Sequence, residues 1–303
     1  MINSALLIGC GDIGANYDIN SDDVLTHAKA LSKSNWIRRV DLFDINKLHQ
    51  KIISNKYNFI FLNSKKKINY KNYDLVIIST PTDTHYEYLK SCINSNVPLV
   101  VCEKPVSNSV KELNSLLKLY KSNNTRIIVN YFRRFQKSYF KAMSKLDFIG
   151  YNPNKISVKY CKGFLNNAGH ALDFIEFFLK ISLEPIEVEV LNKNYDFFKK
   201  DPTLSANFIS QNIEFNIRGM DLNNKIFEIE FLYDNYTLTL KDRGDKIVIF
   251  KGEDLFFESE NLTNNYMIDV YDMVKNIFYN EKLNDNFIES VILNQIQINK
   301  FIL

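Results

Sequence analysis

The chain has 303 residues and lacks long hydrophobic runs and blocks of like charge. Its longest apolar runs, such as 75–78 and 99–102, are far too short to cross a bilayer. The 38 basic and 35 acidic residues are scattered and give a net charge of +3, so neither nucleic acid nor a membrane is an expected partner. No charged segment or cleavage site precedes the first apolar run, and we therefore expect a soluble cytoplasmic protein.

Cysteine and histidine are also sparse, and their spacing excludes two classes of site. The four cysteines, Cys10, Cys92, Cys102 and Cys161, form no CxxC pair. A disulfide framework or a zinc ribbon is therefore not expected, and reduced thiols are. The four histidines show no HExxH or HxH spacing, so we predict no metal site.

The length favours two domains, and the first 130 residues alternate short β-branched runs with longer amphipathic stretches. The runs are nearly continuous in hydrophobicity, as in parallel strands covered on both faces. They are Ala5–Ile8, Val40–Phe43, Phe59–Leu62, Leu75–Ile78, Leu99–Cys102 and Arg126–Val129. Capping-box patterns at Thr84–Glu87 and Ser109–Glu112 predict helix starts between strands. These βαβ units predict a doubly wound parallel sheet, the Rossmann arrangement.

After residue 131 the pattern changes to longer runs in which apolar and polar residues alternate. Two helix-like stretches, 135–146 and 170–179, flank a strand at 155–161. The later alternating runs are 187–191, 208–217, 225–232, 236–240 and 246–250, and two amphipathic helices close the chain. This alternation predicts a large, mostly antiparallel sheet with one covered face. We expect an α/β fold with a dinucleotide-binding Rossmann domain at 1–131 and an α+β domain for substrate binding and oligomerisation at 132–303.

Glycine is scarce, yet three of the nine glycines lie in one turn directly after the first predicted strand. The turn, Gly9-Cys10-Gly11-Asp12-Ile13-Gly14, matches GxGxxG. Gly9 permits the tight turn, Gly11 lets the backbone approach a pyrophosphate, and Gly14 permits close packing of helix on strand. This placement favours dinucleotide binding, through Asp12 and Ile13 as well as the glycines, over a glycine turn without a ligand.

Asp44 ends the second predicted strand, where an acidic side chain accepts hydrogen bonds from the adenosine ribose and repels a 2′-phosphate. It lies about 30 residues beyond the glycines rather than the usual ~20, so the first helix or its loop must be longer than usual. The alternative is an ordinary turn or capping Asp at the start of the next helix. We predict NAD as the cofactor rather than NADP.

Three further segments show a common pattern: Ser79–His85, Cys102–Pro105 and Asn166–Asp173. The first contains TPxxxH, the second EKP, and the third ends in HxxD. Together with His27 and Arg134, they resemble the Gfo/Idh/MocA family of sugar and polyol oxidoreductases. The similarity extends from residue 5 to about residue 175, and the sheet-rich second half suits that family's second domain.

The resemblance implies roles for the matched residues. Lys104 corresponds to the family's catalytic lysine, His170 to its active-site histidine, and Glu103 would lie near the nicotinamide ribose. An ammonium stabilises a developing alkoxide, and an imidazole exchanges a proton near neutral pH. The remaining matched positions would bind the cofactor (Thr80, Pro81, His85) or the substrate (Lys104, Arg134). Without the resemblance, Lys104 would be a surface lysine and His170 a helix-cap or core histidine.

One position departs from the family pattern. Many members carry an Asp four residues before the histidine, and this chain has Asn166 there. An amide cannot accept a proton, so no mechanism that uses a carboxylate at this position is open to the protein. Asn166 and Asn167 could still hydrogen-bond sugar hydroxyls. Asp173, three residues after His170, either orients the imidazole or is structural.

The resemblance thus implies an NAD-dependent oxidoreductase that acts on a secondary hydroxyl or ketone of a sugar or sugar nucleotide, similar to members from surface-carbohydrate pathways. It also implies a homodimer or homotetramer that pairs through the second sheet. One alternative is a non-catalytic NAD-binding sensor of the same fold, which Asn166 favours and the lysine–histidine pair disfavours. Another is imine or enone reduction, as in bilin-reducing relatives, which lack that pair.

Overall fold

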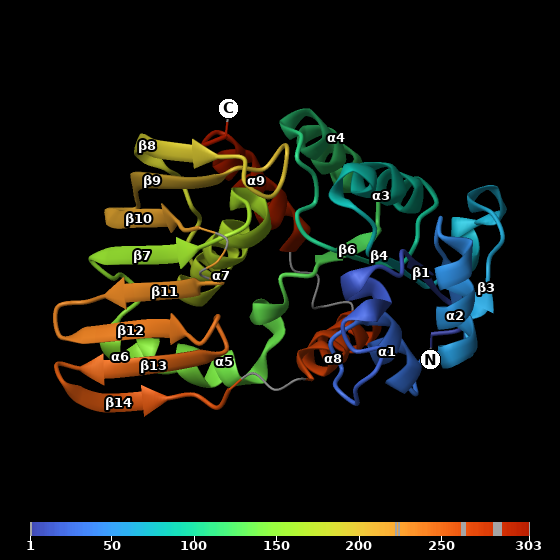
Figure 1. Ribbon diagram of the computed structural model, residues 1–303, viewed down its shortest axis with the longest axis horizontal. Coiled ribbons are helices and arrows are strands. Elements are labelled where there is room, and N and C mark those ends of the chain that lie inside the picture. Colours follow the sequence, from blue (N-terminus) through green and yellow to red (C-terminus); the bar gives the residue numbers. More distant parts are fainter. Residues whose placement is uncertain (1, 222, 224, 262–264, 281–286, 303) are drawn as a thin grey trace. The chain divides into compact units, whose positions relative to one another are not determined.

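The computed structural model describes residues 2–221, 223, 225–261, 265–280 and 287–302 (Figure 1). The described chain forms two compact units. The first comprises Met1–Phe135 and Thr263–Ile292, and the second comprises Gln136–Leu262 and Leu293–Leu303. Each unit has its own hydrophobic core.

The first unit is built on a six-stranded parallel sheet with the order β3-β2-β1-β4-β5-β6. Every residue of β1, β4 and β5 is buried, so both faces of the sheet are covered, as the continuous apolar runs predict. The strands are β1 (Ala5–Ile8), β2 (Val40–Phe43), β3 (Ile60–Phe61), β4 (Leu75–Ile78), β5 (Leu99–Cys102) and β6 (Arg126–Val129). The predicted doubly wound fold is confirmed.

The helices of the first unit alternate with these strands. They are α1 (His27–Lys33), α2 (Lys47–Tyr57), α3 (His85–Asn94), α4 (Val110–Lys121) and α8 (Tyr266–Tyr279). The predicted cap at Ser109 is present, since its side chain accepts a hydrogen bond from the amide of Glu112. Helix α3 also starts where the Thr84 pattern predicts, but the side chain of Thr84 makes no capping hydrogen bond. Its hydroxyl lies 2.7 Å from the hydroxyl of Thr80 and 2.8 Å from the carbonyl oxygen of Pro81, and the short helix 82–84 runs directly into α3.

Helix α8 follows the second sheet in sequence but packs in the first unit. One stripe of the helix, formed by Met267, Val270, Tyr271 and Val274, is buried in the core that contains α1. The domain limits expected from the sequence assign this segment to the second half. The apolar stripe is correctly predicted by its helical spacing, but the spacing does not identify the surface that the stripe covers.

The second unit is built on an eight-stranded sheet with the order β14-β13-β12-β11-β7-β10-β9-β8. All its neighbours are antiparallel except the parallel pair of β7 and β10. Helices α5 (Lys137–Met143), α6 (Leu146–Ile149) and α7 (Gly169–Leu179) pack on one face (Figure 1). The strands are β7 (Lys155–Tyr160), β8 (Ile186–Asn194), β9 (Thr203–Ser210), β10 (Ile213–Gly219), β11 (Phe227–Leu232), β12 (Tyr236–Lys241), β13 (Lys246–Lys251) and β14 (Asp254–Glu258). Helix α9 (Phe287–Asn299) starts in the first unit and ends in the second.

The run 208–217, predicted as one strand, is a hairpin of β9 and β10. The two residues between them, Gln211 and Asn212, have φ of 50° and 63°. Two consecutive left-handed residues form a tight connection whose twist matches that of the flanking strands. Neither residue is glycine, so the sequence gives only a weak turn signal at this point.

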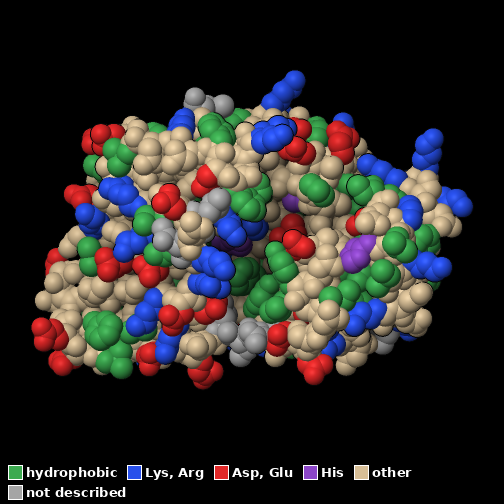
Figure 2. All heavy atoms as spheres, in the orientation of Figure 1, with side chains coloured by type: hydrophobic (Ala, Val, Ile, Leu, Met, Phe, Trp, Pro, Cys, Tyr) green, Lys and Arg blue, Asp and Glu red, His purple; other side chains and the backbone are tan. Residues whose placement is uncertain are grey.

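Charged side chains of both signs are interspersed on the face shown in Figure 2. Among the described residues, no helix is long and apolar enough to cross a membrane, and no group of His, Cys, Asp or Glu has the arrangement of a metal site. All four cysteines are buried and unbridged.

Candidate functional site

The turn Gly9–Gly14 follows a backbone path that requires glycine at two positions. Gly9 has a φ of 93°, and a Cβ on it would lie 2.7 Å from the carbonyl oxygen of Ser79. A Cβ on Gly14 would lie 2.7 Å from the carbonyl oxygen of Gly9. At Gly11, in contrast, no heavy atom lies within 4 Å of the Cβ position. The turn is therefore packed on one side and open at Gly11.

The helical segment η1 (Asp12–Asn16) begins directly after this open position. Gly11 is its N-cap, and no side chain caps it. The first amides of a helix have no acceptor within the helix, and their aligned dipoles favour an anion. These amides include those of Asp12 and Ile13. The open face at Gly11 and the uncapped amides fit the pyrophosphate of a dinucleotide.

A loop between η1 and α1 explains the long spacing from the glycines to Asp44. The loop is organised by Asp18, which is completely buried. Its carboxylate accepts hydrogen bonds from the amides of Leu25 and Thr26 and from the hydroxyl of Thr26, at 2.7–2.8 Å. The ammonium of Lys29 donates to the carbonyl of Asp18 at 2.8 Å. The extra residues thus form an ordered loop before α1 rather than a longer helix.

Asp44 lies at the carboxyl end of β2 and is bonded to the glycine turn. Its Oδ2 accepts from the backbone amide of Cys10, and its Oδ1 accepts from that of Asn46, both at 2.7 Å. Burial, followed by the Asp44 carboxylate, raises the pKa of the Cys10 thiol far above its usual range. Asp44 thus lies at the strand end from which Rossmann folds contact the ribose, and it also accepts a turn hydrogen bond just before α2.

His85 links the turns that follow β4 and β5. Its Nε2 lies 2.7 Å from the carbonyl oxygen of Thr80, and its Nδ1 lies 2.9 Å from that of Pro105. Burial lowers the pKa of His85, although the two carbonyl contacts oppose this shift. A neutral imidazole has one N–H and can donate to only one of these carbonyls at a time. The ring therefore holds the segment that contains Lys104 against the segment that contains Thr80.

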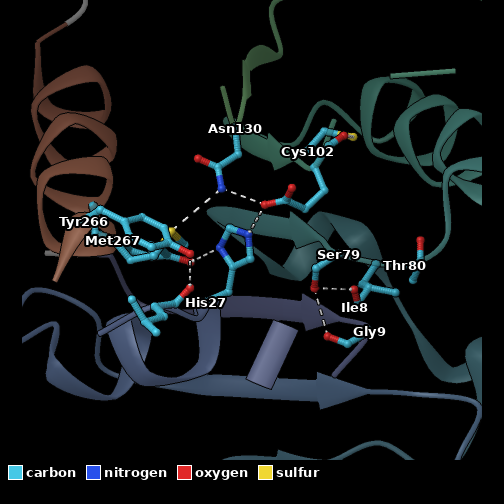
Figure 3. A network of polar contacts seen from close by, with 12 residues as sticks. Ile8, Gly9, His27, Ser79, Thr80, Cys102, Asn130, Tyr266 and Met267 are labelled. Atoms are coloured by element: carbon cyan, nitrogen blue, oxygen red, sulfur yellow. Dashed lines mark hydrogen bonds and ion pairs between the residues drawn. The ribbon is translucent and has the colours of Figure 1, made fainter. Parts of the chain in front are cut away.

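His27 and Asn130 belong to a buried polar network (Figure 3), and both contact Glu103. Its Oε1 lies 2.9 Å from Nε2 of His27 and 2.6 Å from Nδ2 of Asn130, while Nδ1 of His27 lies 3.0 Å from the hydroxyl of Tyr271. Burial alone would raise the pKa of Glu103. The contact with His27, followed by Asn130 and Lys104, outweighs it and holds the pKa below its usual range. The carboxylate is thus ionised, and it connects α1, β6 and α8 to the end of β5.

Lys104 follows Glu103 directly and is partly exposed. Arg134 lies in the short helix η5 (Phe132–Phe135) after β6 and is buried. In the first unit, the residues matched to TPxxxH and EKP therefore lie at the carboxyl ends of β4 and β5, the sheet edge at which open α/β folds bind ligands. His170 belongs to the second unit.

In the second unit, a continuous helical segment carries the remaining predicted residues. It consists of η6 (Phe164–Ala168) and α7, and His170 and Asp173 are buried in it. Residues 166 and 170 are four apart and lie on the same side of a helix. The amide nitrogen of Asn167 donates to the carbonyl of Cys161 at 2.6 Å.

Sequence reasoning missed Asp201, which lies just before β9 and contacts this segment. Its carboxylate accepts from the backbone amides of Leu165 and Asn166 and from Nδ2 of Asn166, at 2.8–2.9 Å. Only 1% of Asp201 is exposed, and burial raises its pKa although these hydrogen bonds oppose the shift. The only sequence signal is Gly163, where a Cβ would clash with Asp201 at 2.4 Å.

Comparison with known proteins agrees with this geometry. Residues 4–131 match the oxidoreductase family GFO_IDH_MocA, described as having an NAD-binding Rossmann fold. The family resemblance found in the sequence is confirmed for this part of the chain.

A curated relative is inositol 2-dehydrogenase from Rhizobium meliloti, with 25% identity over 141 residues, which are 46% of this chain and 39% of that enzyme. The aligned part spans 19% and 39% of the two curated relatives that match. A dehydrogenase structure from Clostridium difficile has a TM-score of 0.75 at 18% identity. The similarity covers 99% of this chain and 98% of that dehydrogenase. A 3-ketoreductase from Actinomadura kijaniata, in complex with NADP and TDP-benzene, has a TM-score of 0.79 at 11% identity. The similarity covers 98% of this chain and 96% of the ketoreductase. These similarities confirm the expected fold along the whole chain.

Proposed function

We propose that the protein is an NAD-dependent oxidoreductase that transfers a hydride between nicotinamide and a secondary hydroxyl or ketone of a sugar or sugar nucleotide. The observation that carries the proposal is the combination, at one sheet edge, of the open glycine turn, Asp44 and Lys104. The relatives' names include an inositol dehydrogenase and a ketoreductase crystallised with a TDP compound, which supports this substrate class.

The chemistry requires a donor at the reacting oxygen and an acceptor for its proton. When bound, NAD supplies the hydride acceptor. The Lys104 ammonium would donate a hydrogen bond to the substrate oxygen and stabilise the alkoxide that develops as hydride leaves. His170 would take the proton, because an imidazole titrates near the working pH. Arg134, Asn166 and Asn167 would position the hydroxyls of the substrate.

A screen of alcohols tests the proposal directly. Purified protein is incubated with NAD and, in turn, with myo-inositol, UDP-N-acetylglucosamine and a panel of other sugars and nucleotide sugars. Formation of reduced nicotinamide is followed by its near-ultraviolet absorbance, and NAD binding is measured in parallel. We expect turnover on at least one compound. NAD binding without turnover across the panel would favour the non-catalytic sensor, the second candidate, for which Asn166 in place of the family's Asp is the specific observation.

The choice between NAD and NADP gives a separate prediction. Asp44 would accept hydrogen bonds from the ribose hydroxyls of NAD and repel the 2′-phosphate of NADP. We expect NAD to bind more tightly than NADP, and we expect Asp44→Asn to reduce the ratio of the two affinities by roughly tenfold. Asparagine still offers an oxygen to the Cys10 amide, and the substitution removes the charge together with the bond that Asp44 accepts from the Asn46 amide. Titration of both cofactors by fluorescence measures the ratio, and equal affinities in the wild type would contradict the assignment.

A further inference from the structure

A groove in the first unit lies between the end of α1 and one side of α8, and its volume is about 200 Å³. Its lining includes residues from α1, from the segment that follows it and from α8. They are Ala30, Lys33, Trp36, Ile268, Tyr271 and Lys275. The proposed function assigns a role to none of these residues, so the groove is a feature that the cofactor chemistry leaves unexplained.

Both walls of the groove are held in place by hydrogen bonds. On the α1 side, the carbonyl of Trp36 accepts from the amide of Ile2 at 2.9 Å, and the amide of Arg38 donates to the carbonyl of Ile2 at 3.0 Å. On the α8 side, Tyr271 is buried, and its hydroxyl lies 3.0 Å from Nδ1 of His27. The groove is therefore formed before any ligand arrives, as is usual for small-molecule sites.

The size and the aromatic walls of the groove favour a ligand with one ring. An apolar cavity of about 150 Å³ admits benzene. The volume of about 200 Å³ thus accommodates a six-membered ring with one small substituent. The indole of Trp36 and the phenol of Tyr271 offer surfaces against which an aromatic ring packs in stacked or edge-to-face geometry.

The charges at the groove favour an anionic substituent on that ring. Lys33 on α1 and Lys275 on α8 are both exposed. Within the described residues, neither ammonium has a hydrogen-bond or ion-pair partner. Asp272 also lines the groove, so the lining carries two cations and one carboxylate. The excess of positive charge is complementary to an anion, and a carboxylate is small enough to share the groove with a ring.

We propose that this groove binds a small aromatic carboxylate, with its ring against Trp36 and Tyr271 and its carboxylate at Lys33 and Lys275. A protein partner would need far more apolar surface than the groove offers. Trp36 is the only tryptophan of the chain, so its fluorescence reports specifically on this place in the fold.

The first measurement compares three probes that share a benzene ring and differ in charge: benzoate, benzyl alcohol and benzylamine. The emission of Trp36 is followed during titration of the full chain at constant ionic strength, and free N-acetyltryptophanamide gives the correction for absorption and collisional quenching. We expect a saturable change with benzoate, half complete at about 1 mM or below. Benzyl alcohol should bind roughly three- to tenfold more weakly, the scale of exposed ion pairs, and benzylamine more weakly still.

Two results of this titration would overturn the inference. Without a saturable change on addition of benzoate, the groove is not a site for this class of ligand. Equal affinities for the three probes would show an apolar crevice that does not recognise charge.

The second measurement tests the two lysines with the double variant Lys33→Gln, Lys275→Gln. Lys51→Gln is the matched control, since Lys51 is exposed on α2 and does not line the groove. A ligand that binds only the folded state raises the midpoint of urea unfolding. We expect benzoate to raise it for the wild type and for Lys51→Gln, and to raise it less for the double variant, whose affinity for benzoate should fall roughly three- to tenfold.

If benzoate stabilises the double variant as much as the wild type, the carboxylate binds elsewhere and the inference fails. Neither measurement uses NAD or a sugar. The result is therefore independent of whether the proposed function holds.

Discussion

His85 is the residue on which burial and hydrogen bonding oppose each other most clearly. Two carbonyl oxygens face its ring nitrogens, an arrangement that favours the imidazolium, yet burial lowers its pKa. Since the folded pKa lies below the value of about 6.5 for an unfolded chain, the unfolded state binds the proton first as the pH falls. The contribution of His85 to stability is therefore complete above that value and is lost on acidification.

We predict that His85→Gln removes this part of the acid sensitivity. The glutamine amide can still donate to one carbonyl but does not titrate. The measurement is the free energy of unfolding in urea between about pH 5 and pH 8, where the variant should show a flatter profile than the wild type. His49→Gln is the control, because His49 is partly exposed. If the free energy of unfolding of His85→Gln depended on pH as steeply as that of the wild type, His85 would not be the source of the acid sensitivity.

Lys104 gives the sharpest prediction for the chemical step. If its ammonium acts on the substrate oxygen, it is not needed to hold the adenosine half of NAD, which would rest on the glycine turn and Asp44. Lys104→Ala should keep NAD affinity within a few-fold and reduce turnover by roughly 10²-fold or more. Lys111→Ala, on the exposed side of α4, is the control. Near wild-type turnover in Lys104→Ala would require another active site.

At the scale of elements, the contact of His27 with Glu103 connects the start of α1 to the end of β5. Both side chains are buried, so removal of the histidine leaves a carboxylate with one donor fewer inside the unit. We predict that His27→Phe lowers the free energy of unfolding by about 3 kcal/mol, the scale for breaking a buried pair. Chemical denaturation measures the loss.

The matched control for this pair replaces both partners. The double variant His27→Phe, Glu103→Leu removes both partners of this contact and should recover much of the loss, since apolar pairs of similar volume often substitute for buried ion pairs. Equal destabilisation of the single and double variants would show that packing around His27, rather than the uncompensated carboxylate, determines the cost.

Elements were predictable where one physical signal dominated. The strands of the first sheet were predicted nearly to the residue because burial on both faces produces continuous apolar runs. The hairpin at Gln211 and Asn212 was missed because two non-glycine residues adopt the left-handed region there. Strand β14 was missed too, since most of its residues are exposed and their alternation is weak.

The candidate site was likewise predictable from the sequence only in part. Gly9, Gly11, Gly14 and Asp44 form a local pattern with a known geometry, and the structure brings them together as predicted. Asp201 lies 35 residues from Asn166 in sequence. No local spacing links the two, so this contact becomes visible only when β7, η6 and β9 are placed in one unit.

For the whole molecule, the open face of the second sheet determines the character of any subunit contact. Cross-strand neighbours at its centre are Asn216, Ser157, Glu230 and Thr239. This face does not need an apolar cover, so an interface formed on it would be polar and sensitive to charge.

We predict a homodimer or homotetramer that uses this face, and we expect Glu230→Lys at its centre to shift the population toward monomer. Light scattering after size-exclusion chromatography, at micromolar concentration, gives the mass of each species. Lys251→Glu, exposed near the end of β13, serves as the control for a charge change elsewhere. A monomeric wild type at this concentration would argue directly against the assembly.

The rates at which the four buried cysteines react with a thiol reagent report local opening of the fold. A thiol reacts as its thiolate and only when a reagent can reach it. All four cysteines are buried, and burial also raises the pKa of Cys10, Cys92 and Cys102. Cys10 differs from the others because it lies inside the glycine turn, between the packed Gly9 and the open Gly11. Its labelling rate therefore measures how often that turn opens. Slower labelling of Cys10 in the presence of NAD, with the other cysteines unaffected, would report occupancy of the turn without a known substrate.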